Sequence, residues 1–195
     1  MTPAHRIRDN ALIDALEAFP AVPFAGPVWR VVREGRDVLA GSAVGGRWDD
    51  ATFDVLYTSQ AGDGAVAEMH FHLTRGQPVV PSRVAYRLHE LKVAMARTLH
   101  LADLDAIAAL GVDTSRYGTL SHAERGQEYP RTQEIAETAH FVGFDGMVVP
   151  NARWHCLNVV LFCDRLAPAD AEVVADHGPI DWAAWRKATA GRYRP

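Results

Sequence analysis

The sequence predicts one mixed domain of helices and strands, either α/β or α+β. The chain has 195 residues, which is enough for a single domain with a substantial core. Its content of 48% hydrophobic and 23% charged residues is ordinary for a globular protein. Segments with helical spacing interleave with short β-branched runs, and we find no internal repeat or low-complexity linker. We therefore expect one domain over residues 1–195.

The first third of the chain predicts a helix and two strands. Apolar residues recur at helical spacing over residues 7–19, and this helix ends at a proline-rich region. β-branched runs predict short strands at 28–32 and 55–59. A glycine-rich loop at 41–46 lies between them.

The next segment, residues 65–73, fits either a helix or a strand. As a helix it follows Asp63, a candidate N-cap, and presents an apolar stripe. As a strand it alternates, with apolar side chains inward and Glu68, His70 and His72 outward. Both alternatives stay open at the level of the sequence.

The remaining segments complete the predicted domain. The polar span 111–129 is typical of a long surface loop, and the last predicted helix packs Trp182 and Trp185 on the body. The predicted strands are 84–91, 147–149 and 156–162, and the predicted helices are 102–110, 132–142 and 180–190.

Composition argues against several classes of function. The net charge of −4 and the pI near 6.1 are unlike those of a nucleic-acid binder, so we expect no direct nucleic-acid contact. The basic residues at 186–194 are interpreted as a solvated tail. We find no signal-peptide pattern and no apolar run long enough for a bilayer, so we expect no membrane association. The two cysteines, Cys156 and Cys163, are expected to be buried thiols in a reducing cytoplasm.

Three common catalytic motifs are absent from the sequence. No GxGxxG follows a strand, which argues against an ordinary dinucleotide-binding fold. Neither a GxxxxGK[ST] loop nor a G-x-S-x-G elbow occurs, which argues against the common nucleotide triphosphatases and hydrolases.

One cluster of residues predicts a binding site. The stretch Gly45-Gly46-Arg47-Trp48 places an arginine behind two glycines, which allow the backbone to crowd against a ligand that the guanidinium binds. Tyr57 and then Glu68 follow in apolar surroundings. An arginine, an aromatic ring and a carboxylate together suit a phosphorylated ligand with a flat ring.

An alternative site uses Glu68, His70 and His72 as metal ligands. On a strand these side chains share a face and form a two-histidine, one-carboxylate arrangement. On a helix, His70 points away from the other two, and the arrangement is broken.

The order of several motifs resembles the RES-domain family, which is named for an arginine, a glutamate and a serine. The resemblance runs from about residue 28 to 162. The motifs that carry it are Trp29-Arg30, Gly45-Gly46-Arg47-Trp48, Leu56-Tyr57-Thr58-Ser59, Ala67-Glu68 and Asp145-Gly146-Met147-Val148-Val149-Pro150.

This resemblance implies an α+β fold, an ADP-ribosyltransferase-like mixed or antiparallel sheet with flanking helices. It also implies a cytoplasmic toxin of a bacterial toxin–antitoxin pair that consumes NAD as its substrate, without a metal. The expected reaction is transfer of ADP-ribose to a protein acceptor, with NAD phosphorolysis or hydrolysis as alternatives. The implied partner is an antitoxin of the helix-turn-helix type that occludes the active site.

Position by position, the resemblance assigns roles to six residues. Arg47 and Glu68 match the family arginine and glutamate, and Tyr57 matches an active-site tyrosine. Arg30 matches a second pocket arginine, and His72 lies where some members have a functional histidine. The implied catalytic residues are Glu68, Arg47 and His72, and the implied NAD-binding residues are Arg30, Arg47, Tyr57 and Asn151.

Asn151 is the departure from the family pattern, because it stands where the serine is expected. It can donate and accept hydrogen bonds but has no hydroxyl group. A catalytically inactive member that only binds a partner is therefore a further alternative.

Overall fold

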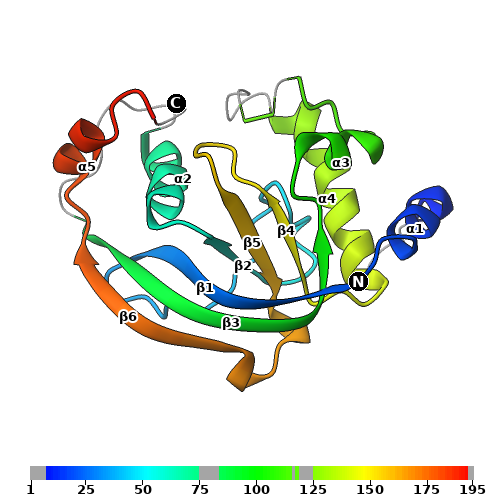
Figure 1. Cartoon of the computed structure of the whole chain (residues 1–195), viewed down its shortest axis with the longest axis horizontal. Helices are drawn as coiled ribbons and strands as arrows, with labels where there is room; N and C mark the ends of the chain where they lie inside the picture. Colours follow the sequence, from blue (N-terminus) through cyan, green and yellow to red (C-terminus); the bar gives the residue numbers. More distant parts are fainter. Residues whose placement is uncertain (1–7, 75–83, 116, 119–124, 193–195) are drawn as a thin grey trace, which may run out of the picture.

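The protein is an α+β domain in which a six-stranded sheet is flanked by helices, as the sequence predicts (Figure 1). The computed structural model describes residues 8–74, 84–115, 117–118 and 125–192. The strands are β1 (Val22–Arg33), β2 (Val55–Ser59), β3 (Tyr86–His100), β4 (Gly146–Pro150), β5 (Leu157–Phe162) and β6 (Ala171–Pro179). The helices are α1 (Asn10–Glu17), α2 (Gly62–Thr74), α3 (Leu104–Ala109), α4 (Arg125–Phe141) and α5 (Trp182–Ala188), with short 3₁₀ turns at Cys163–Arg165 and Pro168–Asp170.

The sheet consists of two antiparallel halves that are joined at two places. One half contains β1, β3 and β6, and the other contains β2, β5 and β4. β1 meets β2 at the pair Trp29 and Ser59. The end of β3 runs parallel to β4 over Thr98–His100. The strands β1, β2, β5, β4 and β3 thus form a closed series of pairings, and β6 lies outside it on β3.

Three apolar clusters hold these elements together. One lies between the two sheet halves and includes Val28, Leu91 and Val159. A second joins the outer face of β4 and β5 to α1, α3 and α4, where Ile135 and Phe144 are buried. The third packs α2 and α5 against β1 and β3. Burial of these side chains is the main favourable contribution to folding.

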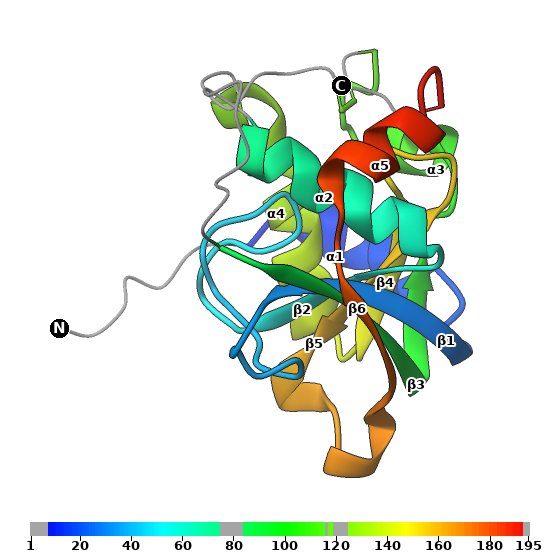
Figure 2. The ribbon, with the colours of Figure 1, turned by 90° about the vertical axis from the view of Figure 1, so that its left-hand side faces the viewer.

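The helices cover opposite ends of the sheet. Figure 1 shows α2 and α5 at one end and α1, α3 and α4 at the other. In Figure 2, which is turned by 90°, α2 and α5 lie on the same side of β1, β3 and β6. Residues of both groups of helices, in α2 and in α4, line the cavity that is described below.

The segment 65–73, which fitted two structures, is part of helix α2. The run Gly64–Ala67 is buried against the sheet. The small side chains of this run let the helix backbone approach the strands closely. Asp63 lies in the first turn, not at the N-cap, and accepts a hydrogen bond of 3.0 Å from the indole of Trp185.

β4 and β5 lie within one residue of their predicted ends, whereas β1 and β3 differ more and β6 has no predicted counterpart. β1 begins at Val22 and passes through Pro23 and Pro27. Among the described residues, one edge of β1 pairs only at Trp29, so this edge tolerates residues without an N–H. β3 continues to His100, well beyond the predicted end at residue 91. β6 was not predicted at all, since an edge strand with mostly polar, exposed residues shows no apolar alternation.

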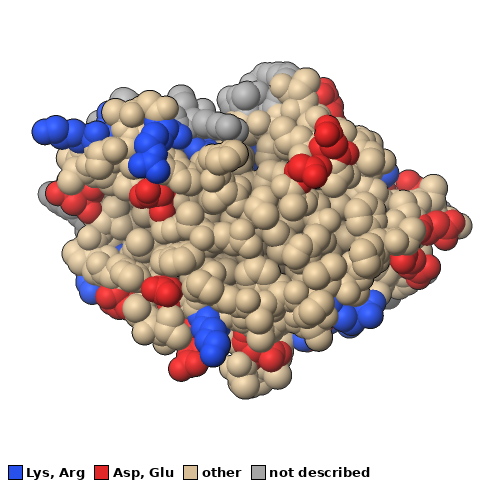
Figure 3. Space-filling view, viewed as in Figure 1, with Lys and Arg blue, Asp and Glu red and all other residues tan. Residues whose placement is uncertain are grey.

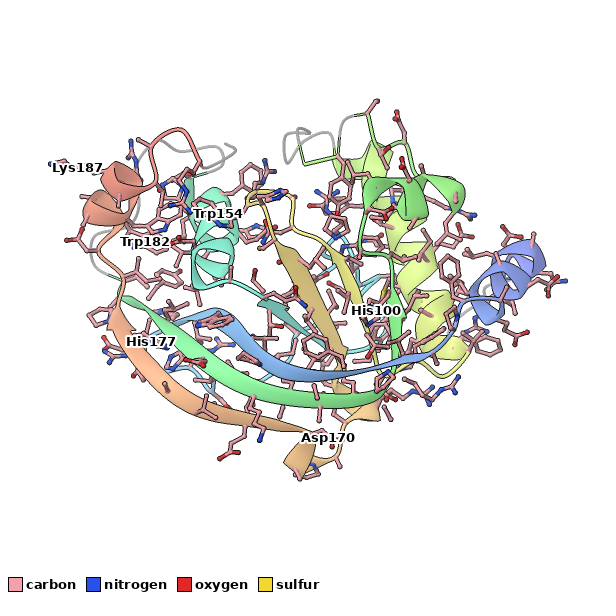
Figure 4. All side chains as sticks on the ribbon, viewed as in Figure 1. His100, Trp154, Asp170, His177, Trp182 and Lys187 are labelled. Carbon is pink, nitrogen blue, oxygen red and sulfur yellow. The ribbon has the colours of Figure 1, made fainter. Side chains whose placement is uncertain are left out.

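Charged side chains are unevenly distributed over the surface. Figure 3 shows Lys and Arg side chains at one end of the molecule, over α5, where Figure 4 labels Lys187.

Both cysteines are free, and burial raises the pKa of each thiol. Among the described residues, no helix combines the length and the apolar character that a membrane span requires.

Replacement of Ile135 tests the packing of α4 on the sheet. Ile135 is fully buried in the cluster that joins α4 to β4 and β5. We expect Ile135→Ala to lower the free energy of unfolding by about 2–5 kcal/mol, because it leaves a cavity. Chemical denaturation measures this change. The exposed Val174 serves as the control, and Val174→Ala should change the value by less than about 0.5 kcal/mol.

Candidate active site

A cavity of about 430 Å³ lies where the two sheet halves meet beneath α2. Its volume is in the range of small-molecule sites. Its wall comes from β1, β2, β5, α2, the glycine loop and the turn after β4. The polar and aromatic side chains that line it are Trp29, Arg30, Ser42, Arg47, Trp48, Tyr57, Thr58, Ser59, Glu68, Phe71, His72, Tyr117, Tyr129, Arg153 and Asn158.

The glycine loop is organised around the buried carboxylate of Asp49. This residue is 0% exposed and accepts hydrogen bonds of 2.7 Å from the backbone N–H groups of both Gly45 and Gly46. It also accepts one of 3.1 Å from the hydroxyl of Tyr57. The same hydroxyl accepts a hydrogen bond of 2.9 Å from the N–H of Trp48. These bonds fix the backbone on both sides of Arg47.

The two glycines are required by this geometry. Gly45 has a φ of 76°, a conformation that other residues adopt only with strain. A Cβ atom on Gly46 would lie 2.6 Å from the Tyr57 hydroxyl and 2.7 Å from a carboxylate oxygen of Asp49. The carbonyl of Gly46 accepts a 2.8 Å hydrogen bond from Gln133, which connects the loop to α4.

Arg47 lies against two tyrosine rings in the cavity wall. The centre of its guanidinium is 4.4 Å from the ring centroid of Tyr117 and 5.2 Å from that of Tyr129. Such contacts hold a cation in place and orient its plane. The prediction that 111–129 is only a surface loop is therefore wrong for these residues. Tyr129 lies in α4, and Tyr117 is tied down by a 2.9 Å bond from its hydroxyl to the carbonyl of Pro150; residues 116 and 119–124 lie outside the described residues.

Arg30 reaches the cavity from β1 and also supports the neighbouring loop. Its guanidinium donates hydrogen bonds of 3.0 Å to the carbonyls of Val38 and Ala40. Burial lowers the pKa of Arg30, but an arginine keeps its charge because the ordinary value lies above 12. Two N–H groups of this guanidinium therefore hold the loop in place.

Glu68 lies on α2 and is held by the opposite wall. Its Oε1 accepts hydrogen bonds of 3.2 Å from the N–H of Ala152 and 3.3 Å from the side-chain amide of Asn158. The first donor belongs to the turn after β4 and the second to β5. One oxygen of this carboxylate on α2 is thus fixed by donors from the sheet and from the turn that follows β4.

The outer face of α2 packs on aromatic residues of α5. The ring of His70 lies 5.9 Å from that of Trp182 and 5.5 Å from that of Trp185, between centroids. Figure 4 shows Trp182 at this junction, and the ring of Trp154 lies 6.3 Å from that of Trp185, between centroids. Burial lowers the pKa of His70, so the ring is neutral near pH 7.

The position of His70 separates it from the other two residues of the alternative metal site. His70 is buried toward α5, whereas Glu68 and His72 line the cavity. Among the described residues, no group of three His, Cys, Asp or Glu side chains is placed to bind a metal ion. The helix therefore does not offer the arrangement that this alternative needs.

The structure brings five of the six predicted residues into one cavity. Arg30, Arg47, Tyr57, Glu68 and His72 all line it, with His72 exposed one helical turn after Glu68. Tyr57 contributes its ring to the wall, while its hydroxyl is engaged in the glycine loop. Burial raises the pKa of Tyr57 well above its usual range, and the Asp49 carboxylate adds to this effect.

Asn151 is not part of the cavity wall. It is 4% exposed, and its Oδ1 accepts hydrogen bonds of 2.7 Å and 2.8 Å from the N–H groups of Arg153 and Trp154. Its Nδ2 donates to Oδ1 of Asn158 at 2.7 Å. We therefore expect Asn151 to act through these neighbours, and not by direct contact with a ligand.

Asn158 and Arg153, like Tyr117 and Tyr129, line the cavity and were not predicted from the sequence. Asn158 lies within an apolar strand, and nothing in its spacing marks it. Arg153 is 3% exposed, with its guanidinium 3.3 Å from the ring centroid of Phe71. A charged residue in the turn directly after the Val-Val-Pro strand is the signal that could have indicated it.

The charges on the wall favour an anionic ligand. Arg30, Arg47 and Arg153 contribute three guanidinium groups, and Glu68 is the acidic residue among the described lining residues. This positive surplus occurs in a chain with a net charge of −4. A charged cavity of this kind attracts phosphate groups.

Comparison with protein families decides the assignment of the chain. The sequence profile of the RES domain matches residues 27–183. The chain belongs to the RES-domain family. The matched range begins in β1 and ends in α5, so it contains every residue of the cavity wall. A search of curated proteins finds no match to this RES domain.

The fold of this RES domain is shared with a solved structure. The structure is the crystal structure of the M. tuberculosis MbcT–MbcA toxin–antitoxin complex, with a TM-score of 0.77 and 20% sequence identity. The similarity covers 92% of this chain and 97% of the matched chain. At this identity the match establishes the fold.

The role of Asp49 can be tested by an isosteric change. The carboxylate of Asp49 accepts hydrogen bonds from backbone N–H groups and from the Tyr57 hydroxyl. Asp49→Asn replaces one accepting oxygen by an NH₂ group, which then faces some of these donors. We expect the free energy of unfolding to fall by about 2–3 kcal/mol, since a buried donor loses its partner. Denaturant titration measures this change. The neighbouring Asp50, at a more exposed position, supplies the control, and Asp50→Asn should cost less than about 1 kcal/mol.

The buried tyrosine that contacts Arg47 predicts a loss of stability at high pH. Burial raises the pKa of Tyr117 to about 12, above its ordinary value near 10. The folded protein favours the neutral phenol, and this contribution to the free energy of unfolding is complete below the pKa that Tyr117 has in the unfolded chain. It is lost as the pH rises through the pKa that Tyr117 has in the folded protein. The free energy of unfolding should therefore fall between about pH 10 and pH 12, and Tyr117→Phe should flatten this part of the curve. An equally steep fall in the variant would contradict this origin.

Proposed function

We propose that this RES domain is the toxin of a toxin–antitoxin pair and cleaves the nicotinamide–ribose bond of NAD. The observation that carries this proposal is the cavity itself, in which three arginines and aromatic rings surround one anchored carboxylate. Membership of the RES-domain family and the fold shared with the MbcT–MbcA complex support it.

The arginines suit the pyrophosphate of NAD. Arg47 presents a planar guanidinium that the tyrosine rings hold in place, and such a group forms paired hydrogen bonds with phosphate oxygens. Arg30, on β1, lines the same cavity and adds a second positive charge. The ring of Tyr57 provides a surface on which the cationic nicotinamide can stack.

Glu68 is the proposed catalytic carboxylate. When the bond between ribose and nicotinamide breaks, its electron pair leaves with the nicotinamide, and positive charge develops on the ribose. A carboxylate beside the ribose stabilises this charge more in the transition state than in the ground state. The ribose carbon then forms a bond to an acceptor atom, which loses its proton.

His72 is the proposed group that receives this proton. It is exposed at the edge of the cavity on the same helical face as Glu68, where an acceptor would enter. This pair favours transfer of ADP-ribose to a protein acceptor. Phosphate or water in the same position would give NAD phosphorolysis or hydrolysis.

An antitoxin is the proposed protein partner. The matched structure is a toxin–antitoxin complex, and the chain shares its fold over nearly the whole of both chains. We propose that a cognate antitoxin, of the helix-turn-helix type that the family resemblance implies, covers the cavity and blocks the entry of NAD. NAD turnover that persists at a saturating concentration of the bound antitoxin would contradict this part of the proposal.

The reaction can be identified from its products. Purified protein is incubated with NAD in buffer alone, with inorganic phosphate and with a cell extract. Labelled protein identifies transfer, phosphorylated ADP-ribose identifies phosphorolysis, and free ADP-ribose identifies hydrolysis. Metal analysis of the same preparation tests the alternative metal site, because stoichiometric metal without NAD turnover would contradict the proposal.

Replacement of the proposed carboxylate gives the sharpest single test. We expect Glu68→Gln to lower the rate of NAD cleavage by about 100-fold or more, since the amide carries no negative charge toward the ribose. Expression of this variant should no longer arrest growth. Glu172→Gln, an equivalent change at an exposed position on β6, should retain the wild-type rate. Equal rates in the two variants would exclude Glu68 from catalysis.

A further inference from the structure

The described residues hold the carboxylate of Glu68 through one of its two oxygens. Oε1 accepts both hydrogen bonds, from the N–H of Ala152 at 3.2 Å and from Nδ2 of Asn158 at 3.3 Å. Within the described part of the chain, no hydrogen bond reaches Oε2. The carboxylate plane is therefore fixed by one side while the other side stays available to a ligand.

The donor on Asn158 depends on which way its amide points. If the amide were turned over, its oxygen would face Oε1, and two acceptors would oppose each other. Oδ1 of Asn158 accepts a 2.7 Å hydrogen bond from Nδ2 of Asn151. This bond holds the amide of Asn158 with its Nδ2 toward Glu68.

The orientation of Asn151 is determined in turn by the backbone. Its Oδ1 lies 2.7 Å and 2.8 Å from the N–H groups of Arg153 and Trp154, which can only donate. The oxygen must therefore face the turn, and Nδ2 must face Asn158. The two backbone N–H groups thus determine which atom donates in the bond from Asn151 to Asn158 and in the bond from Asn158 to Glu68.

Close packing of α2 keeps the three side chains together. Nδ2 of Asn151 also lies 3.4 Å from the carbonyl of Gly64 in the first half of α2. A Cβ atom on Gly64 would lie 2.5 Å from Sγ of Cys156 and 3.2 Å from Nδ2 of Asn151. The helix can therefore bring Glu68 within reach of Asn158 only because residue 64 has no side chain.

We infer that Asn158 is a positioning residue for the cleavage of NAD and that Asn151 fixes its donor orientation. This inference rests on the proposed function. The chain Asn151–Asn158–Glu68 directs Oε2 toward the ribose and keeps the carboxylate from turning away. It also gives Asn151, which stands in place of the family serine, a role that requires two functional atoms instead of a hydroxyl.

Three variants separate this role from simple structural support. Asn158→Ala removes the donor to Glu68. Asn151→Asp keeps the oxygen that the turn requires but replaces Nδ2 by a second acceptor, so the Asn158 amide should turn its oxygen toward Glu68. The third variant combines both changes. Asn10→Ala makes the same change as the first variant at an exposed position on α1 and serves as the control.

We expect a separation between kcat and KM for NAD. Asn158→Ala and Asn151→Asp should each lower kcat by about 10- to 100-fold, because a misplaced catalytic group loses its alignment. KM should stay within about threefold of the wild-type value, and the double variant should be no slower than Asn158→Ala. An unchanged kcat, or a raised KM alone, would overturn the inference while leaving the proposed function intact.

A measurement without substrate keeps the test independent of NAD turnover. The chain has three asparagines, so the side-chain amide signals of Asn158 can be identified in a ¹⁵N-labelled sample by substitution. Glu68→Ala and Asn151→Asp should each shift these signals. If the wild-type protein does not cleave NAD, the proposed function fails. The amide signals then test by themselves whether Asn158 is held between Asn151 and Glu68. Unshifted signals in both variants would overturn it.

Discussion

The buried carboxylate of Asp49 is the interaction on which the cavity depends. Four donors converge on it: the N–H groups of Gly45, Gly46 and Ala51 and the hydroxyl of Tyr57. A carboxylate with no solvent exposure is stable only when its oxygens are satisfied in this way. Because the same bonds run through the residues on either side of Arg47, the guanidinium is placed before any ligand arrives.

The split sheet provides the rest of the site. The two halves join at Trp29 and Ser59 and again at the end of β3, and the cavity lies beside the first junction. The functional groups come from several elements, and three apolar clusters hold these elements in place. Such an arrangement limits motion of the wall, and preorganised charge is the main source of catalytic power in enzymes that stabilise ionic transition states.

The sequence was informative where local chemistry was unusual. The two glycines before Arg47 and the carboxylate of Glu68 were singled out from the sequence, and the structure places all of them in the wall of one cavity. The strand 55–59 was predicted with its observed bounds, because its β-branched pattern is local. Asn158 and Tyr117 could not be recognised, because their importance depends on contacts with residues far away in the chain. β6 was missed for a similar reason, as its pairing partner and not its own pattern makes it a strand.

The stacking of Arg47 on tyrosine has a consequence for how a ligand enters. The Tyr117 ring lies 4.4 Å from the centre of the guanidinium and occupies the space on that side of it. An anion therefore meets the N–H groups from the remaining directions, and because these groups lie in one plane, it is bound best with its oxygens in that plane. The cavity thereby selects among molecules of equal charge by the direction in which they can present it.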